Sequence, residues 1–273
     1  MACAPQTNAA KNSNLFGISA INDQMHLPDQ IQQGDTTRQM DLESEDQSDA
    51  RTARCVYCGV VAAATEDHIP PKNLFPKPRP SDLVKVDSCR ICNTGASKDD
   101  EYFRLMLAIR HDAGTTPEGH KLWETIKRSL TRSQAQGLTN SLVIATHQKD
   151  VITEGGLFIG TAHAYQVDSE RIRRVIARTT RGLYFTHFGR PIPYQDIVRV
   201  YADDDLRGHP QLESYLAELI TAVTHSEKQC VGDGSVFEYY FKPIADHPTA
   251  SAWVLSFYRS VFFVALNHPP ELK

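Results

Sequence analysis

Two Cys-x-x-Cys pairs constrain the fold of this chain more than any other feature of its sequence. They are Cys55/Cys58 and Cys89/Cys92. Each pair suits a tight knuckle whose sulfurs reach one ion, and four thiolates in tetrahedral geometry are the closed arrangement of structural zinc. The stretch between the pairs is longer than the roughly fifteen to twenty residues of a common zinc ribbon. The spacing therefore predicts a zinc site with a further folded element between its two halves.

The expected redox environment favours this metal interpretation over disulfides. The first residues, "MACAPQTNAAKNSNLF", lack the charged and apolar regions of a secretory signal. The sequence contains no apolar run of about 18 residues, so we expect no membrane partner. A cytoplasmic protein is predicted, in which thiols stay reduced. Four cysteines without a ligand are the alternative.

Residues 1–50 differ in composition from the rest of the chain. They carry eight acidic and two basic side chains, a net of −6, which leaves the remainder at +2 because the whole chain is at −4. The segment is rich in Gln, Asn, Asp and Ser and cannot bury enough apolar surface to offset its ordering entropy. We interpret it as an acidic disordered leader, either a solvated tail or an arm that masks a basic surface.

The pattern of residues 51–113 predicts a small module around the cysteine pairs. The apolar stretch that ends in Asp67 and His68 reads as a strand, which the following double proline stops. The helix after the second pair is expected to be capped by Ser97. The predicted elements are a strand at 60–69, a proline-rich loop at 72–82, a strand at 83–88 and a helix at 97–112.

Residues 114–273 show the mixed periodicity of a second domain. Helices are predicted at 117–136, 168–181 and 211–225. Strands are predicted at 141–147, 156–167, 182–188, 196–202, 235–244 and 252–266. Together with the first module, this predicts an α+β protein with a mostly antiparallel sheet in its C-terminal domain.

Three side chains near the cysteines suit hydrolysis of a phosphodiester. A zinc clamp would bring Asn93, directly after the second pair, against the end of the strand that carries Asp67 and His68. Asp67 and Asn93 offer oxygen, the ligand type that magnesium prefers. His68, on the other side of the strand, would take a proton from water. An isolated Asp-His dipeptide would instead be an ordinary surface pair.

The order Cys-x-x-Cys, "DHIPP", Cys-x-x-Cys-Asn and "SKDDEYF" resembles the zinc-containing type of HNH (His-Me finger) endonuclease over roughly residues 52–112. The resemblance implies a ββα-metal fold, a hairpin followed by a helix. It implies that His68 is the general base and that Asp67 and Asn93 hold a catalytic Mg²⁺ or Mn²⁺. The four cysteines would hold a structural Zn²⁺. The implied partner is nucleic acid, with DNA favoured over RNA. A homodimer is expected if the protein cuts both strands.

One departure from the family leaves an alternative open. The family places an Asn on the second strand to orient the base histidine, whereas this chain reads "LVKVDSC" there. A backbone carbonyl could orient His68 instead, because the ring needs only an acceptor at its other nitrogen. The alternative is a module that keeps the HNH fold without catalysis and binds nucleic acid or another protein.

Basic residues outside the module are candidates for contacts with phosphate. Lys98 follows the second cysteine pair, where a solvated helical turn is the alternative. Residues 171–190 contain no Asp or Glu, and four of their arginines share one helical face: Arg171, Arg174, Arg178 and Arg181. That face would follow a phosphate backbone, or would pair with acidic loops such as "YADDD" at 201–205.

Overall fold

The computed structural model describes residues 54–110, 116–130, 146–153, 155–202, 205 and 209–271. The predicted acidic leader and the predicted domain boundary at 113/114 lie outside these residues. Most of the described chain belongs to one compact unit, and residues 147–164 belong to a second. Strands β3 (Thr146–Ile152) and β4 (Phe158–Tyr165) pair with each other, and all but their outer ends belong to this second unit.

A short hairpin and a long helix carry the cysteine pairs. The hairpin consists of β1 (Thr65–Ile69) and β2 (Val84–Ser88), paired antiparallel with His68 opposite Lys85. The loop between the strands contains the single helical turn η1 (Lys72–Leu74). Helix α1 (Arg90–Ile109) follows directly, and α2 (Pro117–Leu130) comes after it. The predicted pair of strands and both predicted helices are present, although α1 has a different start.

The larger sheet has five antiparallel strands in the order β5-β9-β8-β7-β6. Its members are β5 (Ile197–Ala202), β6 (Gln229–Val231), β7 (Phe237–Pro243), β8 (Ser251–Phe257) and β9 (Val261–His268). The predicted α+β class and antiparallel sheet are confirmed.

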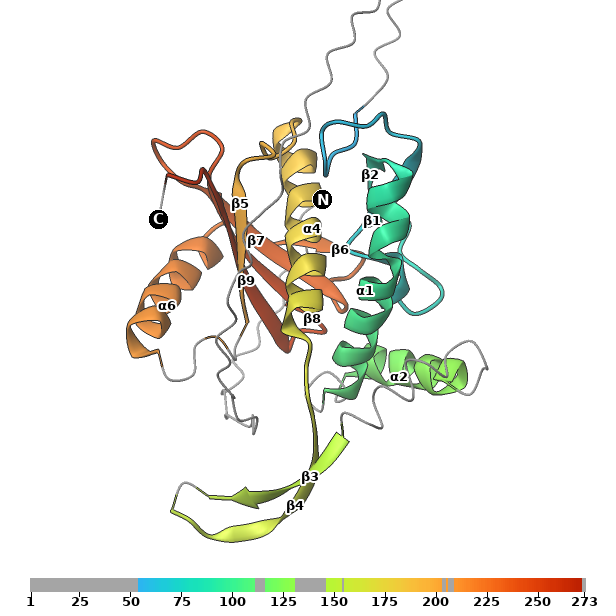
Figure 1. Ribbon diagram of the computed structural model, residues 1–273, viewed down its shortest axis with the longest axis vertical. Coiled ribbons are helices and arrows are strands. Elements are labelled where there is room, and N and C mark those ends of the chain that lie inside the picture. Colours follow the sequence, from blue (N-terminus) through green and yellow to red (C-terminus); the bar gives the residue numbers. More distant parts are fainter. Residues whose placement is uncertain are drawn as a thin grey trace, which may run out of the picture. The chain divides into compact units, whose positions relative to one another are not determined.

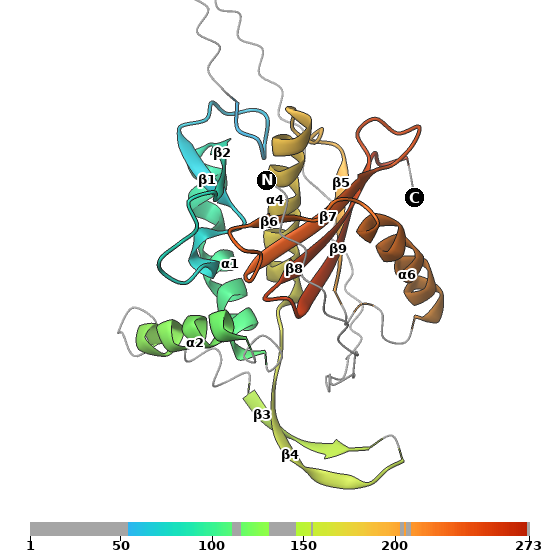
Figure 2. The ribbon, with the colours of Figure 1, turned by 180° about the vertical axis from the view of Figure 1, so that it is seen from behind.

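Two helices cover opposite faces of this sheet, because successive residues of a strand point to opposite sides. Helix α4 (Ser169–Phe188) lies on the face that contains Trp253 and Leu255, and α6 (Pro210–Thr224) packs against Ala252 and Val254. Figures 1 and 2 show α4 and α6 on the two sides of the sheet, with α1 alongside α4.

The hairpin, α1 and the sheet share one hydrophobic core. Ile69 of β1 and Leu74 of η1 are fully buried, in one cluster with side chains of α4 and β8. Phe103 of α1 makes an edge-on ring contact with Phe257 of β8, at 5.1 Å between centroids. The hydroxyl of Tyr258 donates a hydrogen bond to the carbonyl of Leu74. The module around the cysteines is therefore packed against the C-terminal sheet.

Two sequence predictions about helices are wrong. Helix α1 begins at Arg90 and not at Ser97, because Cys89 takes the N-cap position. Residues 182–188, predicted as a strand, continue α4 as far as Gly189, whose φ of 66° ends the helix in the left-handed conformation. The aromatic residues of this stretch face the core from the helix.

Candidate metal centre and the residues around it

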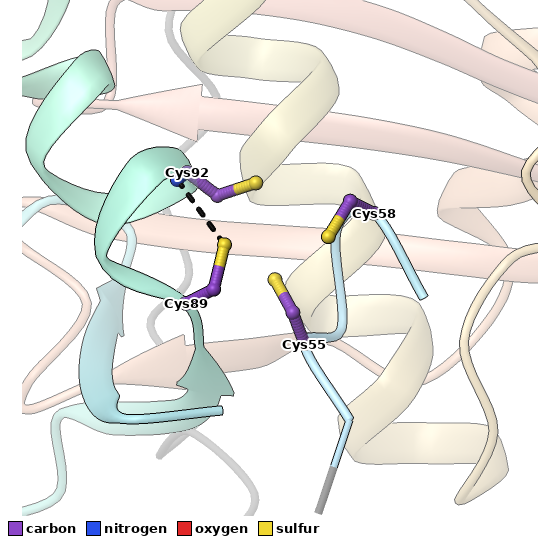
Figure 3. Close-up of side chains that lie close together, drawn as sticks. All are labelled: Cys55, Cys58, Cys89 and Cys92. Atoms are coloured by element: carbon purple, nitrogen blue, oxygen red, sulfur yellow. Dashed lines mark hydrogen bonds between the residues drawn. The ribbon is translucent and has the colours of Figure 1, made fainter. Parts of the chain in front are cut away.

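The four predicted zinc ligands lie together. Cys55 and Cys58 precede the hairpin, and Cys89 and Cys92 lie at the start of α1 (Figure 3). Their Sγ atoms are all within 4.8 Å of one another. Cys55 and Cys89 are buried, whereas the other two are partly exposed. The prediction that the two pairs meet is confirmed.

Local backbone structure explains how each pair turns toward the centre. After Cys55 the chain closes a turn in which Gly59 N–H donates to the Cys55 carbonyl at 2.8 Å. Gly59 has a φ of 67°, which a residue without a Cβ adopts at little cost. In the second pair, Cys89 Sγ accepts from the Cys92 amide at 3.5 Å, drawn as the dashed line in Figure 3. The second knuckle is thus also the first turn of α1.

The donor set fits a metal ion of zinc type. Around a tetrahedral ion with Zn–S bonds of about 2.3 Å, sulfur atoms lie about 3.8 Å apart. This separation falls within the 4.8 Å that encloses all four Sγ atoms here. All four donors are sulfur, and soft thiolates select zinc over magnesium or calcium. The cluster could therefore hold a metal such as zinc, in a closed site without a position for a substrate.

Asp67, predicted to bind a catalytic cation, lies on the buried side of β1. Its side chain is 9% exposed. One carboxylate oxygen accepts from the His68 amide at 2.9 Å, and the other accepts from the Tyr57 hydroxyl at 2.8 Å. Arg178 Nη1 lies 3.4 Å from that second oxygen. The carboxylate therefore already faces one positive charge.

Arg178 connects three elements at this point. It projects from α4, donates a hydrogen bond to Asp100 of α1 through Nη2, and faces Asp67 of β1. Burial acts to lower the pKa of the guanidinium, but Asp100 and Asp67 outweigh this effect and raise the pKa. Its Nε and Nη1 are buried without a hydrogen-bond partner. Arg178 is therefore a permanently charged group in the interior between the helices and the hairpin.

Asn93, the other predicted cation ligand, ties α1 to β1. Its Nδ2 donates to Thr65 Oγ1 and to the Glu66 carbonyl, both at 3.1 Å. The amide thus lies beside the backbone of the residue that precedes Asp67. The expectation that Asn93 reaches the strand of Asp67 agrees with these contacts.

His68 points to the opposite side of β1 from Asp67 and is partly exposed. Partial burial, followed by the positive charges of Lys72 and Lys85, lowers the pKa of its imidazole. The lowered pKa favours the neutral ring, which is the form that accepts a proton. Within the described parts of the chain no carbonyl or carboxylate accepts a hydrogen bond from this ring, so the backbone acceptor considered from the sequence is not found there.

The predicted arginine face of α4 contacts protein. Arg171 and Arg174 each donate through Nε to Asp99 of α1, at 2.8 and 2.7 Å. Partial burial acts to raise the pKa of Asp99, but the hydrogen bonds and charges of Arg174 and Arg171 together outweigh it and lower the pKa. Arg181 donates to the backbone carbonyl of Asp196 at 3.0 Å. The face is therefore engaged by carboxylates and carbonyls of its own chain, although the side chain of Arg174 remains exposed.

A helix that began at Ser97 would have Asp99 and Asp100 in its first turn, whereas both lie in the middle of α1. Arg173, one residue from the predicted face, pairs with Asp205 of the acidic loop that had been considered as a partner. The side chain of Lys98 is exposed on α1 and remains accessible to a phosphate.

Comparisons of the chain with models of protein families, with curated proteins and with solved structures found no match. Among the described helices, none has the length and apolar character needed to span a membrane.

Proposed function

We propose that the protein is a metal-dependent endonuclease of the HNH type, with DNA as its substrate. The observation that carries this proposal is the attachment of the β1–β2 hairpin to the start of α1, through the four cysteines and through Asn93. This attachment supports a ββα-metal arrangement stabilised by zinc. It leaves His68 and Asp67 at the end of β1, on opposite sides of the strand.

In this proposal His68 acts as the general base. Its neutral imidazole takes a proton from the attacking water, a role that typically contributes about 10²–10⁴-fold to rate. Asp67 and Asn93 are the residues that would hold Mg²⁺ or Mn²⁺, because they offer a carboxylate and an amide oxygen. Such an ion, when bound, supplies positive charge for the developing phosphorane and the departing alkoxide. Tyr57 orients Asp67 by donating to one of its oxygens.

A second function is favoured by two observations at the same residues. Arg178 already compensates the charge of Asp67, and the His68 ring has no acceptor among the described residues to fix its orientation. Both features suit a zinc-stabilised module that binds nucleic acid without cutting it. The two functions differ in whether the phosphodiester bond is broken.

A plasmid-nicking assay with Mg²⁺ or Mn²⁺ distinguishes them. Wild-type protein should nick the plasmid, and His68→Ala should lower the rate at least about 100-fold, as expected for loss of a general base. His147→Ala is the matched control, because this exposed histidine lies on β3 and should have no effect. Absence of cleavage by the wild type on double-stranded DNA, single-stranded DNA and RNA would eliminate the nuclease proposal. Salt-dependent binding without cleavage would favour the second function.

A further inference from the structure

A cavity of about 650 Å³ lies between the loop that follows β1, helix α1 and helix α2. It is lined by Phe75 and Leu122 at its apolar side and by a group of charged residues. These charged residues are Lys77, Arg79, Arg104, Lys121, Arg128 and Glu124. Five cations therefore line this cavity, together with a single carboxylate.

The one carboxylate among the lining residues is shared with a cation outside the lining. Glu124 Oε1 forms a salt bridge with Lys127, which is not among the lining residues. Arg128 Nε donates to the backbone carbonyl of Glu124 at 3.1 Å, and the charge of Arg128 also acts on the Glu124 carboxylate. The cavity is thus a region of positive potential, which attracts anions more strongly in a concave site than on a flat surface.

Arg104 lies at the inner side of the cavity, on α1. Burial lowers the pKa of its guanidinium, and the positive charge of Arg79 adds to this effect, whereas Tyr258 and the carboxylate of Glu101 act in the opposite direction. Its Nε is buried without a hydrogen-bond partner. A buried donor without an acceptor is unfavourable, so an anionic acceptor in the cavity would be stabilised there. Asn73 Oδ1 is a second buried polar atom without a partner, which a water molecule bound to that anion would satisfy.

The residues that line the cavity begin in the sequence shortly after the proposed catalytic residue, His68. Its lining begins at Asn73, five residues after His68, and Arg79 Nε donates to the Lys72 carbonyl at 2.9 Å. The charge of Lys72 acts on the His68 ring, as does that of Lys85. Lys72 therefore connects the surroundings of His68 with the basic loop, whereas Lys85 is paired with Glu66 at 2.8 Å.

We propose that this cavity binds phosphate groups of a polynucleotide strand that passes His68. The choice of ligand rests on the proposed function, whereas the site itself rests on the five cations and on the unpaired Arg104 nitrogen. The strand would approach through the exposed Lys77, Arg79 and Lys121, and one phosphate would accept from Arg104. Guanidinium groups suit this contact because their planar donors match phosphate oxygens.

Binding of fluorescein-labelled single-stranded DNA, measured by anisotropy at several salt concentrations, tests the proposal. All proteins carry His68→Ala, so that cleavage does not interfere. The double variant Lys77→Ala/Lys121→Ala should weaken binding at low salt. It should also reduce the slope of log K against log salt by about 1.4, since each phosphate contact on a single strand contributes about 0.7. Lys149→Ala/Lys242→Ala removes the same charge from β3 and β7 and should leave the slope unchanged.

Equal slopes for the cavity variant and the charge-matched control would overturn the proposal, as would absence of binding by the parent. Displacement of the DNA by inorganic phosphate at the same phosphate concentration would assign the cavity to a free anion and would also overturn it. The outcome is separable from that of the nicking assay. A protein that never cleaves DNA but binds it through Lys77 and Lys121 retains this site and loses the nuclease function.

Discussion

At the scale of single residues, the guanidinium of Arg178 contacts carboxylates on two other elements. Asp67 and Asp100 are both largely buried, with side chains 9% and 15% exposed. Two carboxylates in such a position repel each other unless a cation lies between them. Arg178 supplies this cation from α4, far along the chain from both partners.

Replacement of Arg178 should therefore be strongly destabilising. Arg178→Met leaves Asp67 and Asp100 buried without a counter-charge, and removal of one partner from a buried pair costs about 3–5 kcal/mol. Urea denaturation of the zinc-loaded protein measures this loss. The matched control is Arg174→Ala, whose side chain is 59% exposed and pairs with Asp99. Such an exposed ion pair contributes about 0–1 kcal/mol. Equal losses for the two variants would contradict the role assigned to Arg178.

At the scale of elements, α4 contains residues that favour a strand when considered locally. Residues 182–188 are rich in aromatic side chains, which are enriched in strands. Tertiary packing favours the helical conformation of these residues, because Leu183 and Tyr184 are buried in the core. Gly182 lies in the same turn, where a Cβ would come within 2.5 Å of the Ile69 side chain. The contact between α4 and the end of β1 thus requires a residue without a side chain.

Alanine at this glycine should destabilise the protein, in contrast to the usual effect in a helix. Gly→Ala in a helix interior typically gains about 1 kcal/mol. Gly182→Ala should instead lower the free energy of unfolding by about 1–3 kcal/mol, the usual cost of overpacking. Gly95→Ala in α1 is the control, because a Cβ there meets no atom within 4 Å, and it should be stabilising. Denaturant titration compares the two, and stabilisation by Gly182→Ala would contradict the close packing.

At the scale of the whole molecule, the cysteine cluster and the sheet belong to one packed unit. The hairpin is attached to the sheet through the core at Ile69 and through the Tyr258 hydrogen bond. Asp82 of the loop also accepts from the Gly232 amide at 3.0 Å. Loss of metal is therefore expected to affect the C-terminal sheet as well as residues near the cysteines.

Removal of one thiolate tests this coupling. Cys89→Ser leaves three ligands and removes the sulfur that caps α1, and metal binding at such sites supplies folding free energy. A loss of about 4 kcal/mol lowers Tm by about 8–16 °C in a domain of this size. Thermal unfolding by circular dichroism and metal analysis should show a lower Tm with less bound zinc. Chelation of the wild type should lower Tm equally, and zinc should restore it. An unchanged Tm and metal content would contradict a structural metal.

The sequence by itself determined the features that depend on neighbouring residues. The Cys-x-x-Cys spacing, the proline stop after His68 and the alternation of the C-terminal strands each operate over a few residues. They were sufficient to predict the cysteine cluster, the hairpin and the antiparallel sheet.

Only the tertiary structure decided the features that depend on partners far apart in the chain. The arginines of α4 could form ion pairs with phosphate or with carboxylates, and the sequence alone does not decide between these two partners. Packing of α4 against α1 brings Asp99 and Asp100 to these arginines. The same packing places cations of the loop after β1, of α1 and of α2 around one cavity. Charge compensation is a property of distances in space, so it appears only when the helices are in place.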